Sequence, residues 1–123
     1  IKRKAERHLE KGRIIILAAG TGNPYFTTDS AASLRAIELN AQIMLKGTKV
    51  DGIYDKDPIK HSNAVLYKSI SYSDILKKNL EVMDATAVVM CKENNMPLKV
   101  FNILKKGNLK KAILSDKIGT KIG

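Results

Sequence analysis

The pattern of apolar and polar positions predicts short strands that alternate with helices. Residues 1–11 are charged and favour a helix. Residues 13–19 (RIIILAA) form a short continuous apolar run, which is typical of a strand buried on both faces in a parallel sheet. Residues 29–41 then place apolar side chains at helical spacing, and Thr28 or Asp29 is the expected N-cap of that helix.

The rest of the chain continues the alternation in shorter pieces. Ser-x-x-Asp at residues 71–74 is similar to a capping box and predicts a short helix through Lys78. Asp84 can cap a longer apolar helix that ends at Asn94, and capping is the simplest role for this carboxylate. The other expected elements are strands over residues 42–46, 65–70 and 97–103, a helix or turn over 108–114, and an edge strand over 119–123.

This order of elements predicts the α/β class. Parallel strands need crossover connections, and helices in those connections cover the faces of the sheet. We therefore expect a three-layer αβα sandwich with a mainly parallel sheet. The 123 residues suit one domain, and the sequence has no internal repeat, low-complexity segment or linker. Residues 1–123 are expected to form one structural unit.

Composition narrows the classes of partner. Lys and Arg exceed Asp and Glu by 22 to 12, and the formal net charge of +10 favours an anionic ligand or surface, although a solvated lysine-rich surface explains it equally well. Aromatic residues do not interleave with the lysines, which disfavours nucleic acid. No apolar run approaches the roughly 20 residues of a membrane span, and the single cysteine fits a reducing compartment, so we expect a cytoplasmic protein without membrane contact.

The segment GTGNPYFTTD, from Gly20 to Asp29, is the best candidate for a ligand-binding loop. It follows an expected strand and precedes an expected helix, the place where parallel α/β sheets bind ligands. Gly20 and Gly22 permit a tight turn, and the first amides of the next helix favour a phosphate. Taken alone, these features are equally compatible with an ordinary strand-to-helix turn.

Three ordered blocks are more specific than this loop alone. GTGNPYFTTDSAASLRAIEL resembles the acceptor-nucleotide loop of bacterial uridylate (UMP) kinases, which have the amino-acid kinase fold. LKGTKVDGIYDKDP, residues 45–58, resembles the ATP-side loop of the same family. LEVMDATAVVMCKENNMPLKVFNI is similar to the family's penultimate helix and strand, and the final GTKI resembles the family's usual ending. The resemblance covers essentially the whole chain and corresponds to the carboxy-terminal half of such a kinase.

The resemblance implies a set of site residues. It implies a UMP site at Thr21, Gly22, Asn23, Pro24, Tyr25, Phe26, Thr27 and Thr28. It implies an ATP site at Thr48, Tyr54 and Asp57, with Tyr54 beside the adenine and Asp57 near the ribose or the base edge. Asp29 and Asp51 are implied to organise the reaction centre, and Lys49 to offset phosphate charge.

The resemblance also implies the reaction and its limits. The expected activity is transfer of the γ-phosphoryl group of ATP to UMP, with Mg²⁺ on the phosphates, no metal ligands assigned in this chain, and a homohexamer as the assembly. The amino-terminal half of the family carries a glycine-rich loop with a lysine that meets the ATP phosphates, and a Gly-Gly-Gly-Asn turn. Neither motif occurs in this sequence, so we expect this chain alone to be inactive as a kinase.

Two other classes of function remain open from the sequence. The charge favours a non-catalytic module that binds nucleotides or nucleic acid through its lysines. A different amino-acid kinase, acting on a carboxylate or a carbamate, fits less well because NPYFTTD resembles the uridylate branch.

Overall fold

The computed structural model describes residues 2–18 and 20–123. Among these residues no helix is both long and apolar enough to cross a membrane. The helices are α1 (Lys2–Glu10), α2 (Thr28–Glu38), α3 (Tyr72–Lys77), α4 (Ala85–Glu93) and α5 (Asn108–Leu114). The strands are β1 (Met44–Thr48), β2 (Ser69–Ile70), β3 (Leu98–Asn102) and β4 (Thr120–Ile122).

The four strands form one sheet in the order β1-β3-β4-β2. β1 pairs in parallel with β3, from Met44 opposite Leu98 to Thr48 opposite Asn102. β4 runs antiparallel to β3 and parallel to β2. Because β1 and β3 are parallel, their carboxyl ends lie at the same edge of the sheet, and the loops after Thr48 and Asn102 begin side by side.

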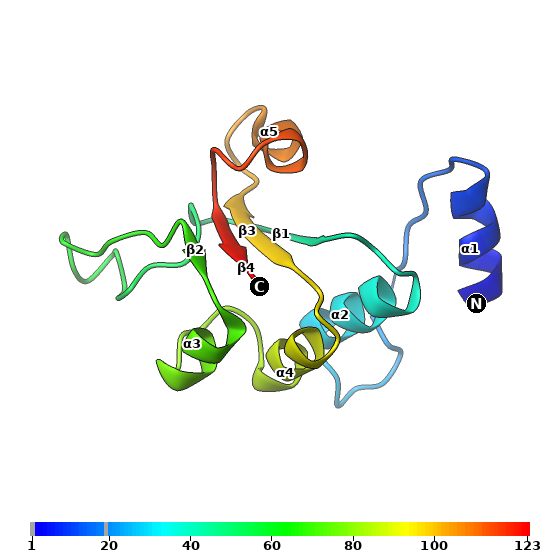
Figure 1. Ribbon diagram of the computed structural model, residues 1–123, viewed down its shortest axis with the longest axis horizontal. Helices are drawn as coiled ribbons and strands as arrows, with labels where there is room; N and C mark the ends of the chain where they lie inside the picture. Colours follow the sequence, from blue (N-terminus) through cyan, green and yellow to red (C-terminus); the bar gives the residue numbers. More distant parts are fainter. Residues whose placement is uncertain (1, 19) are drawn as a thin grey trace.

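Helices cover both faces of this sheet, as the sequence predicts. Figure 1 shows α2, α3 and α4 on one side and α5 on the other. Side chains along β3 alternate accordingly: Leu98 and Val100 join a core with Ile75 and Val88 of α3 and α4. Between them, the Lys99 ammonium group points to α5 and donates to the Ala112 and Ser115 carbonyls at 2.9 and 2.8 Å. The three-layer αβα architecture is confirmed.

The helices on the core side begin at side-chain caps. Ser71 accepts from the Asp74 amide at 3.0 Å and Asp84 accepts from the Ala87 amide at 2.9 Å, as the sequence predicts. Helix α2 differs by one residue, because its N-cap is Thr27 rather than Thr28 or Asp29. Cys91 is buried within this core.

The prediction of a strand over residues 13–19 is wrong for residues 13–18, and Ala19 lies outside the described residues. Residues 13–18 form no part of the sheet, and Ile14 and Ile16 are almost fully exposed. A strand is defined by hydrogen bonds to a neighbour. The apolar run therefore indicates that the segment can form a strand, but no strand of the described residues lies beside it.

Smaller corrections concern the other strands. β1 begins two residues later than predicted and includes Gly47 and Thr48, which we expected in the following loop. Of residues 65–70 only Ser69 and Ile70 form a strand. β4 lies between β3 and β2, so it is an interior strand rather than an edge strand. The segment over 108–114 is a helix, and a mainly parallel sheet is confirmed with β3–β4 as its antiparallel pair.

Candidate functional site

The loop before α2 holds its shape through short hydrogen bonds. Gly20 and Gly22 have φ angles of +60° and +76°, a left-handed conformation that glycine adopts without strain. The Asn23 amide donates to the Thr21 hydroxyl oxygen at 3.1 Å, and the Tyr25 amide donates to Oδ1 of Asn23 at 3.0 Å. The Tyr25 side chain is 93% exposed. The loop therefore presents an aromatic side chain and polar groups outward, on a turned backbone.

Thr27 joins this loop to the amino terminus of α4. Its hydroxyl oxygen accepts from the Ser30 amide at 3.1 Å, and its hydroxyl donates to the Asp84 carboxylate. The Thr27 bond, followed by the Ala87 amide and the Ser30 hydroxyl, lowers the pKa of Asp84 against the opposing effect of burial. Asp84 thus caps α4 and also fixes the start of α2, which its predicted role as a simple cap did not include.

Asp29, in the first turn of α2, pairs with a lysine of the neighbouring strand. The Lys46 ammonium group lies 3.2 Å from one carboxylate oxygen of Asp29 and 3.3 Å from the other. Lys46 also donates to the Val82 carbonyl at 2.6 Å, in the segment that leads to α4. Both side chains are partly exposed, so the pair remains accessible to a ligand as well as ordered.

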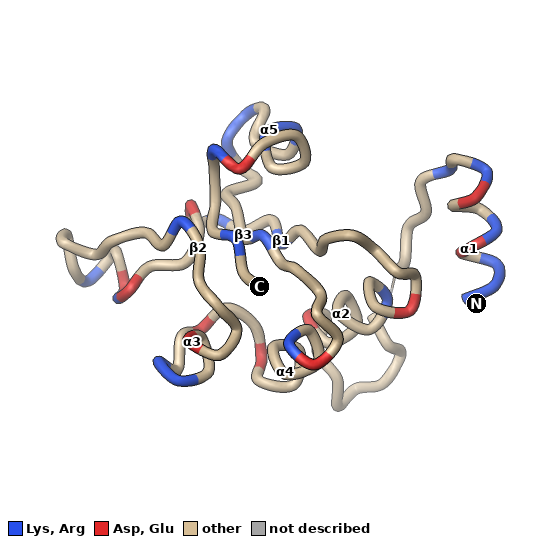
Figure 2. Tube along the Cα trace, in the orientation of Figure 1, with Lys and Arg blue, Asp and Glu red and all other residues tan. Residues whose placement is uncertain are grey.

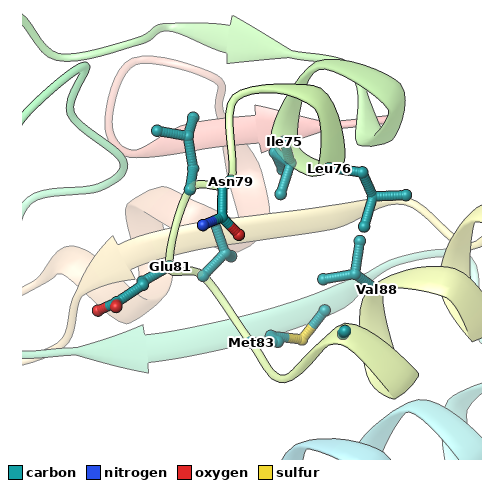
Figure 3. A pocket seen from close by; sticks show the side chains of 9 residues that line it. Ile75, Leu76, Asn79, Glu81, Met83 and Val88 are labelled. Atoms are coloured by element: carbon teal, nitrogen blue, oxygen red, sulfur yellow. The ribbon is translucent and has the colours of Figure 1, made fainter.

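An apolar pocket of about 320 Å³ lies behind this segment, between α3 and α4. Figure 3 shows Ile75, Leu76 and Val88 on the two helices, and Met83 on the chain that joins them. Glu81 is the one ionisable residue among its lining. The pocket lacks converging cationic groups, so it is not suited to a phosphate. Val82 lines this pocket, and its carbonyl also accepts the hydrogen bond from Lys46. The pocket wall therefore helps to position Lys46 beside Asp29.

A second polar cluster follows the carboxyl ends of β1 and β3. The Asp51 carboxylate accepts from Lys105 at 2.9 Å and from the Asn102 amide group at 3.2 Å. These two groups, and to a smaller extent the Tyr54 hydroxyl, hold the pKa of Asp51 below its usual value. Thr48 uses its hydroxyl within the turn, donating to the Val50 carbonyl at 2.8 Å. Its backbone leads directly to Asp51.

Tyr54 and Asp57 lie on the long loop between β1 and β2, residues 49–68, which we call the excursion. Tyr54 is half-buried and forms an isolated antiparallel bridge with Leu66, which closes the base of the excursion. Asp57 is exposed, and its carboxylate accepts from the Ile59 amide at 2.9 Å. The excursion is fixed to the sheet by Thr120, whose hydroxyl oxygen accepts from the Ile53 amide at 2.9 Å and whose hydroxyl donates to the Tyr67 carbonyl.

A lysine-rich pocket of about 530 Å³ adjoins Asp51. Lys105 lines it beside Asn102 at the end of β3, and Gly119 marks its boundary at the start of β4. The lysines that line the pocket are Lys68, Lys105, Lys111 and Lys117. Asp51 is the single carboxylate in the pocket lining, so the pocket is electropositive and suits an anion.

The structure divides the residues singled out from the sequence into two groups. Thr27 and Asp29 lie together at the start of α2, whereas Thr48 ends β1 and Asp51 follows in the next loop. Lys49 is exposed, and the ammonium groups beside the two aspartates belong to Lys46 and Lys105.

Sequence reasoning missed both of these lysines. Lys46 carried a usable signal, because it is the only charged residue of the predicted strand over residues 42–46. Lys105 lay in a run of lysines with nothing to separate it from a solvated surface.

Comparison with known proteins identifies the fold around these clusters. The model of the Amino acid kinase family matches residues 1–102. The chain belongs to this family. A solved UMP kinase from Bacillus anthracis matches it with a TM-score of 0.96 and 35% identity, and covers 100% of this chain and 51% of its own.

Two further solved kinases match over the whole of this chain. The UMP kinase from Ureaplasma parvum gives a TM-score of 0.95 and 42% identity, over 53% of its own chain. The uridylate kinase from Archaeoglobus fulgidus gives 0.79 and 28%, over 58% of its own chain. The predicted resemblance to UMP kinases is confirmed. This chain spans about half the length of these relatives.

Proposed function

We propose that this chain is the acceptor-site and adenosine-site half of a UMP kinase. The observation that carries the proposal is the loop from Thr21 to Thr28, which runs into the amino terminus of α2. The amino terminus of a helix favours a phosphate. The UMP kinase names of two relatives with at least 35% identity support the same substrate. UMP would contact Thr21, Gly22, Asn23, Pro24, Tyr25, Phe26, Thr27 and Thr28.

ATP would take the region after β1. Thr48, Tyr54 and Asp57 line the proposed adenosine site, and the ordered base of the excursion supports them. The exposed Lys49 would offset phosphate charge, and Asp51 would organise the donor side. Asp29 would act on the acceptor side, where Lys46 compensates its charge. The proposal gives the two aspartates separate roles.

The chemistry asked of these residues is positioning and charge compensation. Phosphoryl transfer needs donor and acceptor in line, with little covalent work by the protein. Mg²⁺ would neutralise phosphate charge when bound. No cluster of three His, Cys, Asp or Glu side chains that could hold a metal ion occurs among residues 2–18 and 20–123. The complete kinase is proposed to work in the cytoplasm as a homo-oligomer, and this chain alone to be inactive.

Calorimetric titration with UMP, and with CMP as the control, tests the acceptor site. We expect UMP to bind selectively, and Thr27→Val to weaken binding because it removes the bond to Asp84 and the cap of α2. Thr86→Val, on the exposed side of α4, is the matched control. If the folded chain binds UMP and CMP equally, the assignment of this loop to UMP is wrong.

A basic binding module is the second candidate, and the lysine-rich pocket is the observation that favours it. Figure 2 shows Lys and Arg on α1, at the end of α3 and along α5, so that they are spread over several elements. Binding of a single-stranded oligonucleotide at low and moderate salt tests it. This candidate predicts strong binding that falls steeply with salt and that Lys111→Ala weakens, whereas the UMP kinase proposal predicts little binding at either concentration.

A further inference from the structure

The lysine-rich pocket draws its cationic groups from four separate segments of the chain. Lys68 directly precedes β2, Lys105 follows β3, Lys111 lies on α5, and Lys117 lies in the turn before β4. All four residues are exposed, so a ligand can reach them from solvent. Because lysines from distant segments meet at one cavity, the positive potential inside it exceeds that of lysines scattered over a surface.

The charge of the pocket is poorly compensated by the protein. Its lining has an excess of three positive charges, because Asp51 is the one carboxylate and already pairs with Lys105 at 2.9 Å. Among the ion pairs of residues 2–18 and 20–123, none includes Lys68, Lys111 or Lys117. Like charges held together repel one another, and a bound anion relieves that repulsion.

Asp116 precedes Lys117 in the chain but serves a different lysine. Its carboxylate lies 3.0 Å from the ammonium group of Lys99, which also donates to two carbonyls at the end of α5. Lys99 holds the pKa of Asp116 below its usual value, and Lys121 and Lys68 act in the same direction more weakly. Lys99 and Asp116 therefore form a structural pair, and the lysines of the pocket remain available to a ligand.

The wall of the pocket is fixed to the sheet. The buried Asn108 donates from its amide group to the Asn102 carbonyl at 2.9 Å, and the Asn102 amide group donates to the Asp51 carboxylate at 3.2 Å. Gly119 has a φ angle of +78°, and a Cβ atom there would collide with the Val100 carbonyl oxygen. The backbone at Gly119 therefore lies directly on β3 and gives the pocket an ordered boundary.

The pocket is separate from the loop proposed for UMP. Asn108 and Lys111 place it beside α5, and Figure 1 shows α5 on the opposite side of the sheet from α2, into which that loop runs. The residues proposed above for UMP, ATP and the reaction centre all lie within residues 20–123. Of these residues, Asp51 alone lines the pocket.

We propose that this pocket is a second anion site, which binds a compact ligand with two or three linked phosphate groups. Pockets for small ligands span about 300–1,000 Å³. The volume of about 530 Å³ falls in this range. A single phosphate group carries a charge of about −2 at pH 7, less than the positive excess of the lining, whereas linked phosphates can contact several ammonium groups together. A free triphosphate and the phosphate chain of a nucleotide share this chemistry.

Calorimetric titration of the 123-residue chain with inorganic triphosphate, without Mg²⁺, tests the site. We expect one binding site per chain. Lys111→Gln and Lys117→Gln should each weaken binding about tenfold, because each removes a charge-assisted hydrogen bond to phosphate. Lys110→Gln is the matched control, since it removes the same charge from an exposed position of α5 that does not line the pocket. It should change the affinity by less than about twofold.

Four results would overturn the proposal. Equal weakening by Lys110→Gln and Lys111→Gln would mean that triphosphate senses only the net charge of the chain. Inorganic phosphate that binds as tightly as triphosphate would contradict the ligand class. Displacement of triphosphate by an excess of UMP would mean that the two sites are one. A single-stranded oligonucleotide that binds these lysines more tightly than triphosphate would assign them to nucleic acid.

A second probe, CTP, distinguishes the two sources of linked phosphates. If Lys111→Gln weakens CTP binding as much as triphosphate binding, the pocket accepts the phosphate chain of a nucleotide. If Lys111→Gln weakens triphosphate binding alone, the free polyanion is the ligand. Thermal unfolding of each variant verifies that the substitutions act on binding and not on folding.

Lysine acetylation, mapped by mass spectrometry, gives a readout on the unsubstituted chain. With triphosphate at about ten times its Kd, acetylation of Lys68, Lys111 and Lys117 should slow about tenfold, because the ligand occupies their ammonium groups. Acetylation of Lys110 should not change. Protection that is equal at Lys110 and Lys111 would contradict the site. Neither experiment requires a functional kinase, so failure here is distinct from failure of the UMP assignment.

Discussion

Residues 44–122 and residues 2–18 use their apolar side chains in opposite ways. In the first region the apolar side chains of β3 lie between two helix layers, and Leu98 and Phe101 are fully buried. In the second, a run of three isoleucines has one half-buried member and two exposed ones. Both stretches carry large apolar side chains. What differs is whether the described chain provides a neighbour, so burial here depends on the partner strand as much as on composition.

The most direct way to break this comparison is the same substitution in both regions. Ile75→Ala in α3 should lower the free energy of unfolding by about 2–5 kcal/mol, because Ile75 is 2% exposed and its removal leaves a cavity. Ile14→Ala should change it by less than about 0.5 kcal/mol. Urea denaturation measures both. Equal losses would mean that residues 13–17 are packed in solution.

The next prediction concerns Lys99, a buried charge in the well-packed region. Lys99 is nearly buried and its ammonium group donates to two carbonyls at the end of α5 and to Asp116 at 3.0 Å. Lys99→Met should cost about 2–3 kcal/mol, since it leaves those carbonyls without their charged donor. The control is Lys121→Met on the adjacent strand, where the lysine is exposed. Denaturation curves that coincide for the two variants would contradict the structural role of Lys99.

Thr120 anchors the loop between β1 and β2, on the proposed ATP side, to the sheet. Thr120→Val keeps the shape of the side chain but leaves the Ile53 amide and the Tyr67 carbonyl without a partner. We expect a loss of about 1–2 kcal/mol and faster hydrogen exchange in residues 52–67 than in β3. Thr86→Val should show neither effect. Uniform acceleration through the whole sheet would mean that the excursion is not anchored separately.

The smallest expected effect is a pH dependence at Asp84. Its folded pKa is lowered, so the carboxylate stabilises the fold above the unfolded pKa of about 3.9, and this contribution is lost as pH falls through the folded value. Asp84→Asn retains a cap but removes the charge, and should cost about 0.3–1 kcal/mol at pH 7. The stability difference between the two proteins should shrink as the pH falls through the folded pKa of Asp84. A difference that does not change as the solution is acidified would contradict this account.

The sequence predicts the elements whose signals are local. Ser71 and Asp84 cap their helices as expected, because an N-cap depends on three or four consecutive residues. Strand pairing is not local, and so the sequence misplaced β4 at an edge and assigned residues 13–18 to a strand. Both errors concern which segments are neighbours.

The candidate site also contains a part that is local in sequence and a part that is not. The loop from Gly20 to Thr28 could be singled out from its residues, since glycines, threonines and a helix start are contiguous. The partner of its aspartate could not, because Lys46 lies 17 positions away from Asp29 and meets it only in the fold, where Lys46 also donates to the Val82 carbonyl. The role of Lys105 beside Asp51 has the same cause.

Phosphoryl transfer tests the central claim most directly. The chain alone, and the same chain fused behind the other half of the Ureaplasma parvum kinase, are assayed with ATP and Mg²⁺ against UMP, CMP and AMP. We predict no transfer by the chain alone and transfer to UMP, in preference to CMP and AMP, by the fusion. Transfer by the chain alone would contradict the account. So would a folded fusion that does not phosphorylate UMP.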